Sequence, residues 1–212
     1  MTLIEQVLFI GRGVIVTLKY TLSALAVGLS VGMGLAILRR QILFRWLVDS
    51  VVSLIRGTPL LLQLSFFYFA VPGFLGIRLD IWHAGLIAFG LNSAAYVTEI
   101  FRSGIQSVAK GQFEAAKSLQ IPTLLLWKDI IIPQVLRNIF PALVNEIISL
   151  IKETAIISMF GELDIMRRAQ VVAASQFNYF EALCLAAVYY YSLIFIIERV
   201  TNKIEKTWYA KY

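Results

Sequence analysis

The residues most suited to chemistry are polar side chains that interrupt two strongly apolar stretches. In the stretch about 82–101 and just beyond it, four of them recur at intervals of four, three and four residues, so at about 100° per residue they share one narrow helical stripe. These are Asn92, Tyr96, Glu99 and Ser103. In the stretch about 141–160, a second polar set falls within an arc of about 120°. Its members are Asn145, Glu146, Ser149, Lys152 and Glu153.

Such side chains inside a membrane usually face a bundle interior or a water-filled cavity, because a charge at the centre of a span costs about 2.5–3.5 kcal/mol. Carboxylates, an ammonium, amides and hydroxyls can replace the water that a zwitterionic amino acid loses. The stripes therefore predict a translocation lining made of Asn92, Tyr96, Glu99, Asn145, Ser149, Lys152 and Glu153. An alternative stays open, in which Lys152 pairs with Glu153 or Glu99 only to hold helices together.

Enzymatic chemistry is not expected of this chain. Its one histidine, His83, stands beside Trp82 at the start of an apolar stretch and is expected to be an interfacial anchor. One histidine and one cysteine, Cys184, provide neither a catalytic triad nor a zinc site. No G-x-x-x-x-G-K-[ST] motif occurs, so we expect the chain to bind no ATP, metal or other cofactor.

The composition indicates a helical integral membrane protein of one domain, residues 1–212. Hydrophobic residues make up 59% of the chain, charged residues 15%, and the mean hydropathy is +0.77. Soluble domains carry about 25% charged residues. The apolar runs do not alternate as barrel strands would, so the expected fold class is all-α.

Five stretches are long and apolar enough to predict transmembrane helices. They run about 20–38 with an amphipathic lead-in from about 3 to 19, about 58–72 (or from a deeper start near 48), about 82–101, about 141–160 and about 182–198. Two of them open with prolines, at Thr58-Pro59 and at Pro141. The start of the chain has no basic segment of a signal peptide, so it is expected to be mature protein. Gly28, Gly32 and Gly34 are candidates for close helix packing.

Basic residues predict the orientation of these spans. Four lie in one set of loops: Arg12, Arg78, Arg167 and Arg168. Thirteen lie in the other set: Arg39, Arg40, Arg45, Arg56, Arg102, Lys110, Lys117, Lys128, Arg137, Arg199, Lys203, Lys206 and Lys211. The richer set, comprising 39–57, 102–138 and the C-terminus, is therefore expected in the cytoplasm, with the N-terminus outside. This placement also explains the net charge of +6 without nucleic-acid binding.

The segment about 104–133 predicts a helix, a turn and a second helix, too short and too charged to span a membrane. The first helix covers about 110–120 and includes the small residues Ala115 and Ala116. The second begins after Pro122, and Pro133 is expected to end or kink it. Small residues on one face permit close approach by another protein, although a solvated connector is the simpler alternative.

This segment resembles the EAA loop of binding-protein-dependent ABC importer permeases, through Glu114-Ala115-Ala116 followed by Ile130 and Pro133. Further matches follow in order along nearly the whole chain. They are Arg56-Gly57-Thr58-Pro59-Leu60-Leu61-Leu62-Gln63, Tyr96-Val97-Thr98-Glu99-Ile100-Phe101-Arg102-Ser103-Gly104-Ile105, Pro133-Gln134, Pro141-Ala142-Leu143 with Asn145, Lys152-Glu153-Thr154-Ala155 and Glu162-Leu163. The chain is most similar to permeases of the polar amino acid, histidine/glutamine/arginine-type importers.

The resemblance implies a type I importer fold in a bacterial inner membrane, and an amino acid as substrate. It also implies four kinds of partner: a cytoplasmic ATPase that binds ATP and Mg, a second permease subunit (identical or paralogous), an external binding protein, and membrane lipid. The ATPase contact would involve Gly111, Glu114, Ala115, Ala116, Leu119 and Gln120. Gln120 stands where the family has glycine, which suggests a less tight turn.

Two other functions stay open at this stage. A secondary transporter or channel would use the Glu and Lys stripe as an ion relay and would need neither ATP nor the 109–133 loop. A non-transporting scaffold subunit would use that loop only to recruit a partner, and changes at Glu99 or Lys152 would then leave uptake intact.

Overall fold

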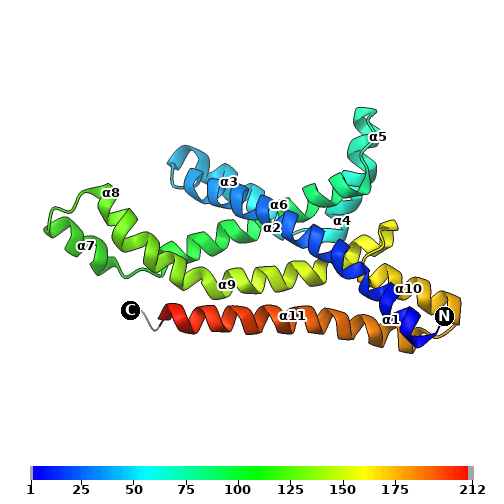
Figure 1. The fold of residues 1–212 in the computed structure, drawn as a ribbon. Coiled ribbons are helices and arrows are strands. Elements are labelled where there is room, and N and C mark those ends of the chain that lie inside the picture. Colours follow the sequence, from blue (N-terminus) through cyan, green and yellow to red (C-terminus); the bar gives the residue numbers. More distant parts are fainter. Residues whose placement is uncertain (1, 210–212) are drawn as a thin grey trace.

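The computed structural model describes residues 2–209, and within them every regular element is a helix (Figure 1). Lys211 therefore lies outside the described residues. The chain begins with α1 (Leu3–Gly11) and α2 (Gly13–Leu38), which form one apolar rod of 36 residues. The predicted span of 20–38 with an amphipathic lead-in was thus too short. Residues 3–19 continue the same helix because hydrogen bonds run across the junction, where the Arg12 amide donates to the Leu8 carbonyl.

The second apolar stretch is a broken helix. α3 (Ile42–Arg56) is followed by α4 (Leu60–Ser65), the π-helical turn Phe66–Ala70 and α5 (Val71–Leu75), with a bend of 99°. The break falls at Gly57-Thr58-Pro59, since proline disfavours a helical residue before it. The expectation that 39–57 is a loop was wrong for most of that range. Val48 and Val52 of α3 are buried with Ala95 of the following long helix, and this contact keeps the segment helical.

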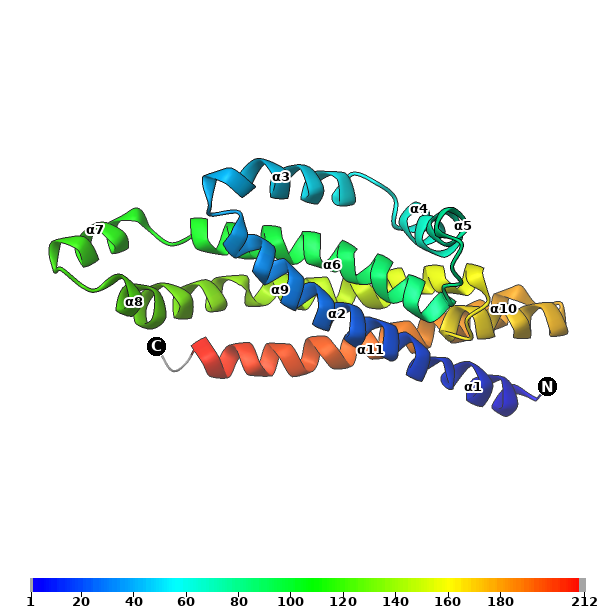
Figure 2. The same ribbon diagram turned by 90° about the horizontal axis from the view of Figure 1, so that it is seen from above.

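The centre of the fold is α6 (Ile81–Gln106), which crosses α2 over much of its length (Figure 2). Glycines at this crossing let the backbones approach. A Cβ at Gly28 would lie 2.3 Å from the Ser93 hydroxyl, and one at Gly32 would lie 2.7 Å from the Ala94 carbonyl. The predicted role of Gly28 and Gly32 is therefore confirmed. A Cβ at Gly34 would meet nothing within 4 Å, so the prediction was wrong for that residue.

After α6 the chain forms a hairpin and then a long helix. α7 (Lys110–Ser118), α8 (Thr123–Leu125) and the π-helical turn Leu126–Ile131 lead directly into α9 (Ile132–Glu153), which ends in the 3-10 helix Thr154–Phe160. Pro133 does not end the second helix of the hairpin, since a π-helical turn precedes it and its missing amide lies in the first turn of α9. The expectation that Pro141 opens a helix was wrong, because Pro141 lies inside α9.

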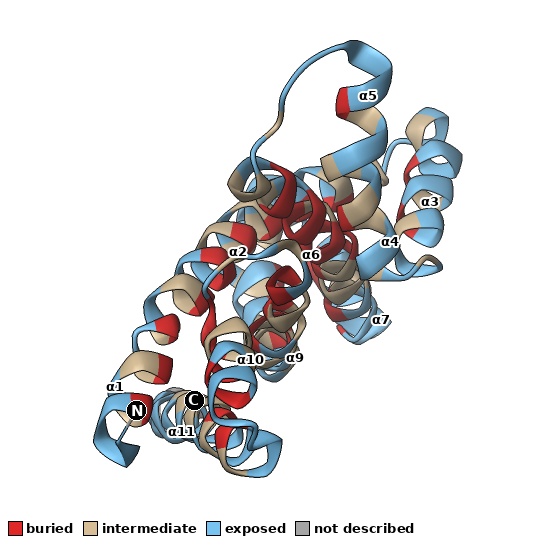
Figure 3. Ribbon diagram, turned by 90° about the vertical axis from the view of Figure 1, so that its right-hand side faces the viewer, coloured by how far each residue is buried: buried red, intermediate tan, exposed pale blue. Residues whose placement is uncertain are grey.

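The last helices are α10 (Ile165–Gln176) and α11 (Tyr179–Tyr209). α10 packs on α1 and α11, while α11 runs beside α9 (Figures 1 and 2). Buried residues gather in one cluster where α2, α4, α6 and α9 meet, and in another where α1, α10 and α11 meet (Figure 3). Among the described residues, three helices are apolar enough to span a membrane, and the bent α3–α5 pair is a fourth candidate. The remaining predicted span, about 141–160, lies in α9 and the 3-10 helix that follows it, and α9 carries more polar residues, so the count of five stays a prediction.

The segments predicted on one side of the membrane lie at one end of the molecule (Figure 1). The α7 end contains the α7–α8 hairpin (residues 110–131), the turn between α2 and α3, and the last part of α11. The α10 end contains the start of α1, α5 and α10. Which end faces the cytoplasm stays a prediction from the distribution of basic residues.

Candidate functional site

The structure separates the polar stripe of α6 into two environments. Asn92 is 5% exposed and faces α9, where its Nδ2 donates to Glu153 Oε2 at 3.2 Å. One residue of the α6 stripe, Asn92, therefore contacts one residue of the α9 arc, Glu153, inside the bundle.

Tyr96 and Glu99 lie further along α6 and face α3 instead. The Arg56 guanidinium lies 5.2 Å from the centre of the Tyr96 ring, and Arg56 Nη1 lies 3.8 Å from Glu99 Oε2. Arg102 Nη2 lies closer to the same oxygen, at 2.6 Å. This network borders a cavity of about 390 Å³ between α3 and α6. Ser103 is exposed, and its hydroxyl donates to the Ile100 carbonyl.

The polar arc of α9 spans the boundary between a buried and an open face. Glu146 is 7% exposed and lies next to Ser93 of α6. Asn145 and Lys152 are exposed, and Ser149 is half-buried. We name Asn145, Ser149 and Lys152 the open face of α9. Asn145 also borders a cavity of about 370 Å³ against the polar end of α11, which includes Glu198 and Asn202.

The hydrogen bond between Asn92 and Glu153 shows where the open face lies along the length of the bundle. Asn92 lies near the middle of α6, which runs Ile81–Gln106. Glu153, and Lys152 beside it, therefore lie near the middle of the bundle. Asn145 is seven residues before Lys152 on α9, or about 10 Å nearer the α7 end. An exposed lysine at mid-depth needs water or a partner, because lipid does not solvate an ammonium.

The alternative in which Lys152 pairs with Glu99 is not supported, and a pair with Glu153 stays a prediction. Within the described residues, the ion pairs of Glu99 are to Arg56 and Arg102, not to Lys152. Sequence reasoning missed both arginines as partners. The sequence offered a signal for each: Arg56 directly precedes the break at Gly57-Thr58-Pro59, and Arg102 lies about one helical turn after Glu99. What the sequence does not give is the packing of α3 on α6 that joins the three residues.

The α7–α8 hairpin is held together by its inner face. Ala116 is 2% exposed, so this alanine supports the hairpin instead of lying on its outer surface. The Phe113 and Trp127 rings, one from each limb, lie 6.1 Å apart. Arg40, just after α2, places its guanidinium 4.1 Å from the centre of the Trp127 ring. The hairpin is therefore connected to α2 as well as to α6 and α9.

The outer face of α7 is open. Gly111, Glu114 and Ala115 are exposed, and Leu119 is 73% exposed. Leu124, on the second limb, is 76% exposed. We name Gly111, Glu114, Ala115 and Leu119 the outer face of α7. It combines small residues, one carboxylate and an apolar side chain, which is a surface that another protein can approach closely.

The turn after α7 is tight, so the expectation of a less tight turn at Gln120 was wrong. Gln120 adopts a left-handed conformation with φ of 53°. Its amide donates to the Lys117 carbonyl at 3.1 Å, and the Ile121 amide donates to the Ala116 carbonyl at 2.9 Å. These two bonds form the Schellman motif that ends many helices, usually with glycine at the left-handed position. Gln120 forms the same turn at the cost of some strain.

Comparison with known proteins agrees with this geometry. Residues 26–207 match the family described as binding-protein-dependent transport system inner membrane component. The Rickettsia typhi protein GlnP, by name a glutamine transport system permease, is 51% identical over 203 residues, covering 95% of this chain and 93% of its own. The Bacillus subtilis arginine transport system permease protein ArtQ is 42% identical, covering 96% and 94%.

The same fold occurs in solved structures. A crystal structure of an amino acid ABC transporter with histidines matches with a TM-score of 0.91 and 35% identity, covering 97% of both chains. The MetNI methionine ABC transporter, in an inward-facing conformation, matches with a TM-score of 0.70 at 16% identity and shows the fold alone. With its apolar helices, its α7–α8 hairpin and these matches, the chain belongs to the family of binding-protein-dependent transport system inner membrane components and is an inner-membrane permease subunit of a bacterial ABC transport system.

Proposed function

We propose that this chain forms half of the translocation pathway of an ATP-driven amino acid importer. The observation that carries the proposal is the open face of α9, where Lys152 is exposed near the middle of the bundle. The described residues leave Asn145 and Lys152 exposed, so a second permease subunit that presents its own open face would complete a water-filled pathway. Carboxylate and ammonium groups of an amino acid would find Lys152, Asn145 and Ser149 there.

The substrate class follows from the relatives. The Rickettsia typhi and Bacillus subtilis relatives described above, by name a glutamine and an arginine permease, are 51% and 42% identical to this chain. Both substrates have a zwitterionic backbone and a polar side chain, which suits a lining of amides, a hydroxyl and an ammonium. An external binding protein would deliver the amino acid at the α10 end.

Energy would enter at the α7 end. The outer face of α7 would dock on a cytoplasmic ATPase that holds ATP and Mg. Movement of this ATPase would displace the α7–α8 hairpin. Because Trp127 contacts Arg40 and the second limb continues into α9, the displacement would reach the helix that carries Lys152.

A reconstituted importer tests this proposal. Vesicles would contain the permease, its ATPase and its binding protein, and both amino acid uptake and ATP hydrolysis would be followed. Glu114→Lys, on the outer face of α7, is expected to abolish ATP-driven uptake. Asp129→Lys, an exposed site with the same charge change on the second limb, should keep most of it. Uptake by the wild-type permease without ATP, or normal coupling in Glu114→Lys, would refute the proposal.

A further inference from the structure

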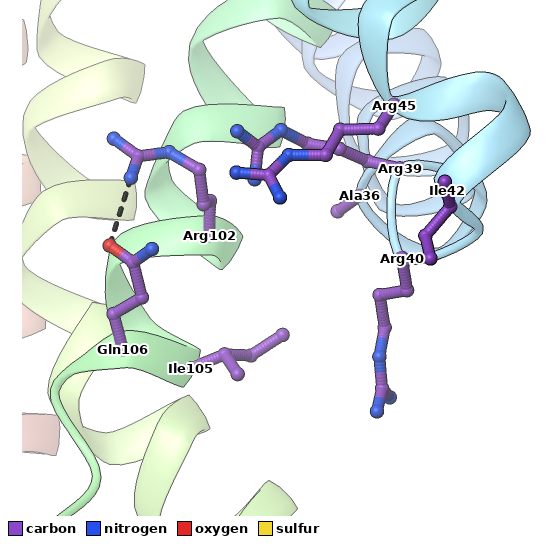
Figure 4. A pocket seen from close by; sticks show the side chains of 8 residues that line it. All are labelled: Ala36, Arg39, Arg40, Ile42, Arg45, Arg102, Ile105 and Gln106. Carbon is purple, nitrogen blue, oxygen red and sulfur yellow. Dashed lines mark hydrogen bonds between the residues drawn. The ribbon is translucent and has the colours of Figure 1, made fainter.

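A basic pocket lies at the α7 end, outside the candidate pathway. Its volume is about 270 Å³, and it is formed by the last residues of α2, the start of α3 and the last turns of α6. Eight residues line it: Ala36, Arg39, Arg40, Ile42, Arg45, Arg102, Ile105 and Gln106 (Figure 4). Four of the eight carry a guanidinium and none carries a carboxylate.

The charges of this pocket are only partly compensated by neighbours. Asp49 pairs with Arg39 and lies 3.9 Å from the Arg45 Nε, and the Arg45 side chain is 66% exposed. Glu99 pairs with Arg102, whose Nη1 also donates to the side-chain Oε1 of Gln106 at 2.8 Å. Two carboxylates therefore face four guanidiniums. Figure 4 shows the Arg39 and Arg45 side chains extending toward α6, and the Arg40 side chain pointing away from them.

An apolar groove continues from the same place. Its volume is about 530 Å³, and it shares Ala36, Arg40 and Ile105 with the basic pocket. Apart from Arg40 its lining is apolar: Met33, Ala36, Ile37, Phe101, Ile105, Trp127, Ile132, Val135 and Leu136. Ile37 is 62% exposed and Ile132 is 45% exposed, so the groove is open to the outside at these two residues. The Trp127 ring of the α7–α8 hairpin forms part of its wall.

We propose that the basic pocket and the apolar groove together bind one anionic phospholipid. The phosphate would lie among the guanidiniums, which bind phosphate oxygens in pairs. An acyl chain would lie in the groove between α2 and α9. The arrangement matches the end of the molecule that is expected at the cytoplasmic leaflet, where basic pockets between helices recognise acidic headgroups. A free phosphate would leave the apolar groove empty, and a second copy of this chain, with its net charge of +6, complements the basic pocket less well.

Quenching of Trp127 fluorescence by brominated lipids tests the site directly. Trp46, Trp82 and Trp208 would be replaced by Phe, and the chain would be placed in vesicles of phosphatidylcholine with added phosphatidylglycerol. Either lipid in turn would carry brominated acyl chains. We expect phosphatidylglycerol to quench Trp127 more than phosphatidylcholine does at equal mole fraction, and an excess of inorganic phosphate to leave this preference unchanged.

Charge removal then identifies the headgroup contacts. Arg40→Gln and Arg45→Gln should each lower the preference for phosphatidylglycerol about five-fold, the equivalent of one basic residue near a membrane surface. Arg78→Gln, at an exposed arginine near the start of α6, should change nothing. Taking the ratio of the two lipids within each variant cancels any direct effect of Arg40 on the Trp127 ring.

Three results would overturn the proposal. Equal quenching by both lipids would show no headgroup site, displacement by inorganic phosphate would show a free anion site, and absence of quenching by either lipid would show that protein covers the groove. If the single-tryptophan chain fails to fold, native mass spectrometry of the wild-type chain with the same two lipids makes the comparison, and retention of equal amounts of both lipids would contradict us.

Discussion

Two kinds of surface differ sharply in this molecule. The crossing of α2 and α6 is complete within the chain, since Gly28 and Gly32 of α2 press directly on Ser93, Ala94 and Val97 of α6. By contrast, most side chains of the outer face of α7 and of the open face of α9 are exposed. The α2–α6 crossing therefore forms a frame within the chain, whereas the proposed function assigns the outer face of α7 and the open face of α9 to contacts with partners outside the chain.

Disrupting the α2–α6 crossing should have the largest effect on stability. In Gly32→Val the new Cβ would lie 2.7 Å from the Ala94 carbonyl and 2.8 Å from Val97, so the helices must separate. We expect a loss of stability of about 1–3 kcal/mol or more, as for other overpacked interiors. Thermal unfolding in detergent measures it.

Gly34→Val is the matched control, two residues along the same helix with free space around it. Its stability should stay within about 0.5 kcal/mol of wild type. Equal damage from both substitutions would show that α2 does not depend on the close crossing.

Changing the open face of α9 should affect transport and leave the fold intact. Lys152→Ala removes an exposed ammonium that no ion pair with Glu99 restrains. We expect uptake to fall about ten-fold, since a hydrogen bond to a charged group contributes about 1.5–3 kcal/mol. Uptake kinetics and melting temperature should be measured on the same preparation. Lys128→Ala, exposed in the α7–α8 hairpin, is the control, and a Lys152→Ala chain that melts early would point to a structural role.

A buried carboxyl group at the α10 end, that of Asp164, gives a further test of the packing within the chain. Asp164 begins α10, accepts from the Arg167 amide at 2.8 Å and from the Tyr190 hydroxyl at 3.2 Å, and its backbone contacts Gly13 of α2. Burial raises the pKa of Asp164 to about 6, above its ordinary value of 3.8. A raised carboxyl pKa means that the folded state binds the proton more tightly, so stability should increase as the pH falls through 6.

The measurement compares wild type with Asp164→Asn, which keeps the helix cap but does not titrate. Between pH 8 and pH 5 the wild type should gain about 1 kcal/mol relative to the variant. A constant difference in melting temperature over this range would show that Asp164 titrates normally.

The smallest effect is expected at the tip of the hairpin. Gln120→Gly relieves a left-handed residue, which costs about 1 kcal/mol for a residue with a Cβ, and part of the gain is lost to backbone entropy. Hydrogen exchange at the Ile121 amide should slow slightly. Gln112→Gly, at an exposed helical position of α7, should have the opposite sign. Faster exchange in Gln120→Gly would show that the glutamine side chain stabilises the turn.

The sequence predicted much of the fold because apolar runs, prolines and basic residues act locally. Apolar runs located the long helices, Pro122 marked the start of the hairpin's second limb, and Glu114-Ala115-Ala116 identified α7. Errors came where packing overrode a local signal. Pro133 did not end its helix, since a π-helical turn precedes it, and Pro141 did not open one, since it lies inside α9. α3 formed in a range expected as a loop, because Val48 and Val52 pack on α6.

By itself, then, the sequence determined which residues are polar within the membrane and which helix carries them. The tertiary structure alone decided the direction in which each one faces. Helical spacing placed Glu146 and Lys152 in one arc, yet α6 buries the first and leaves the second open. Spacing describes one helix, whereas burial depends on which neighbour packs against each side of it, and such neighbours come from segments far apart in the chain.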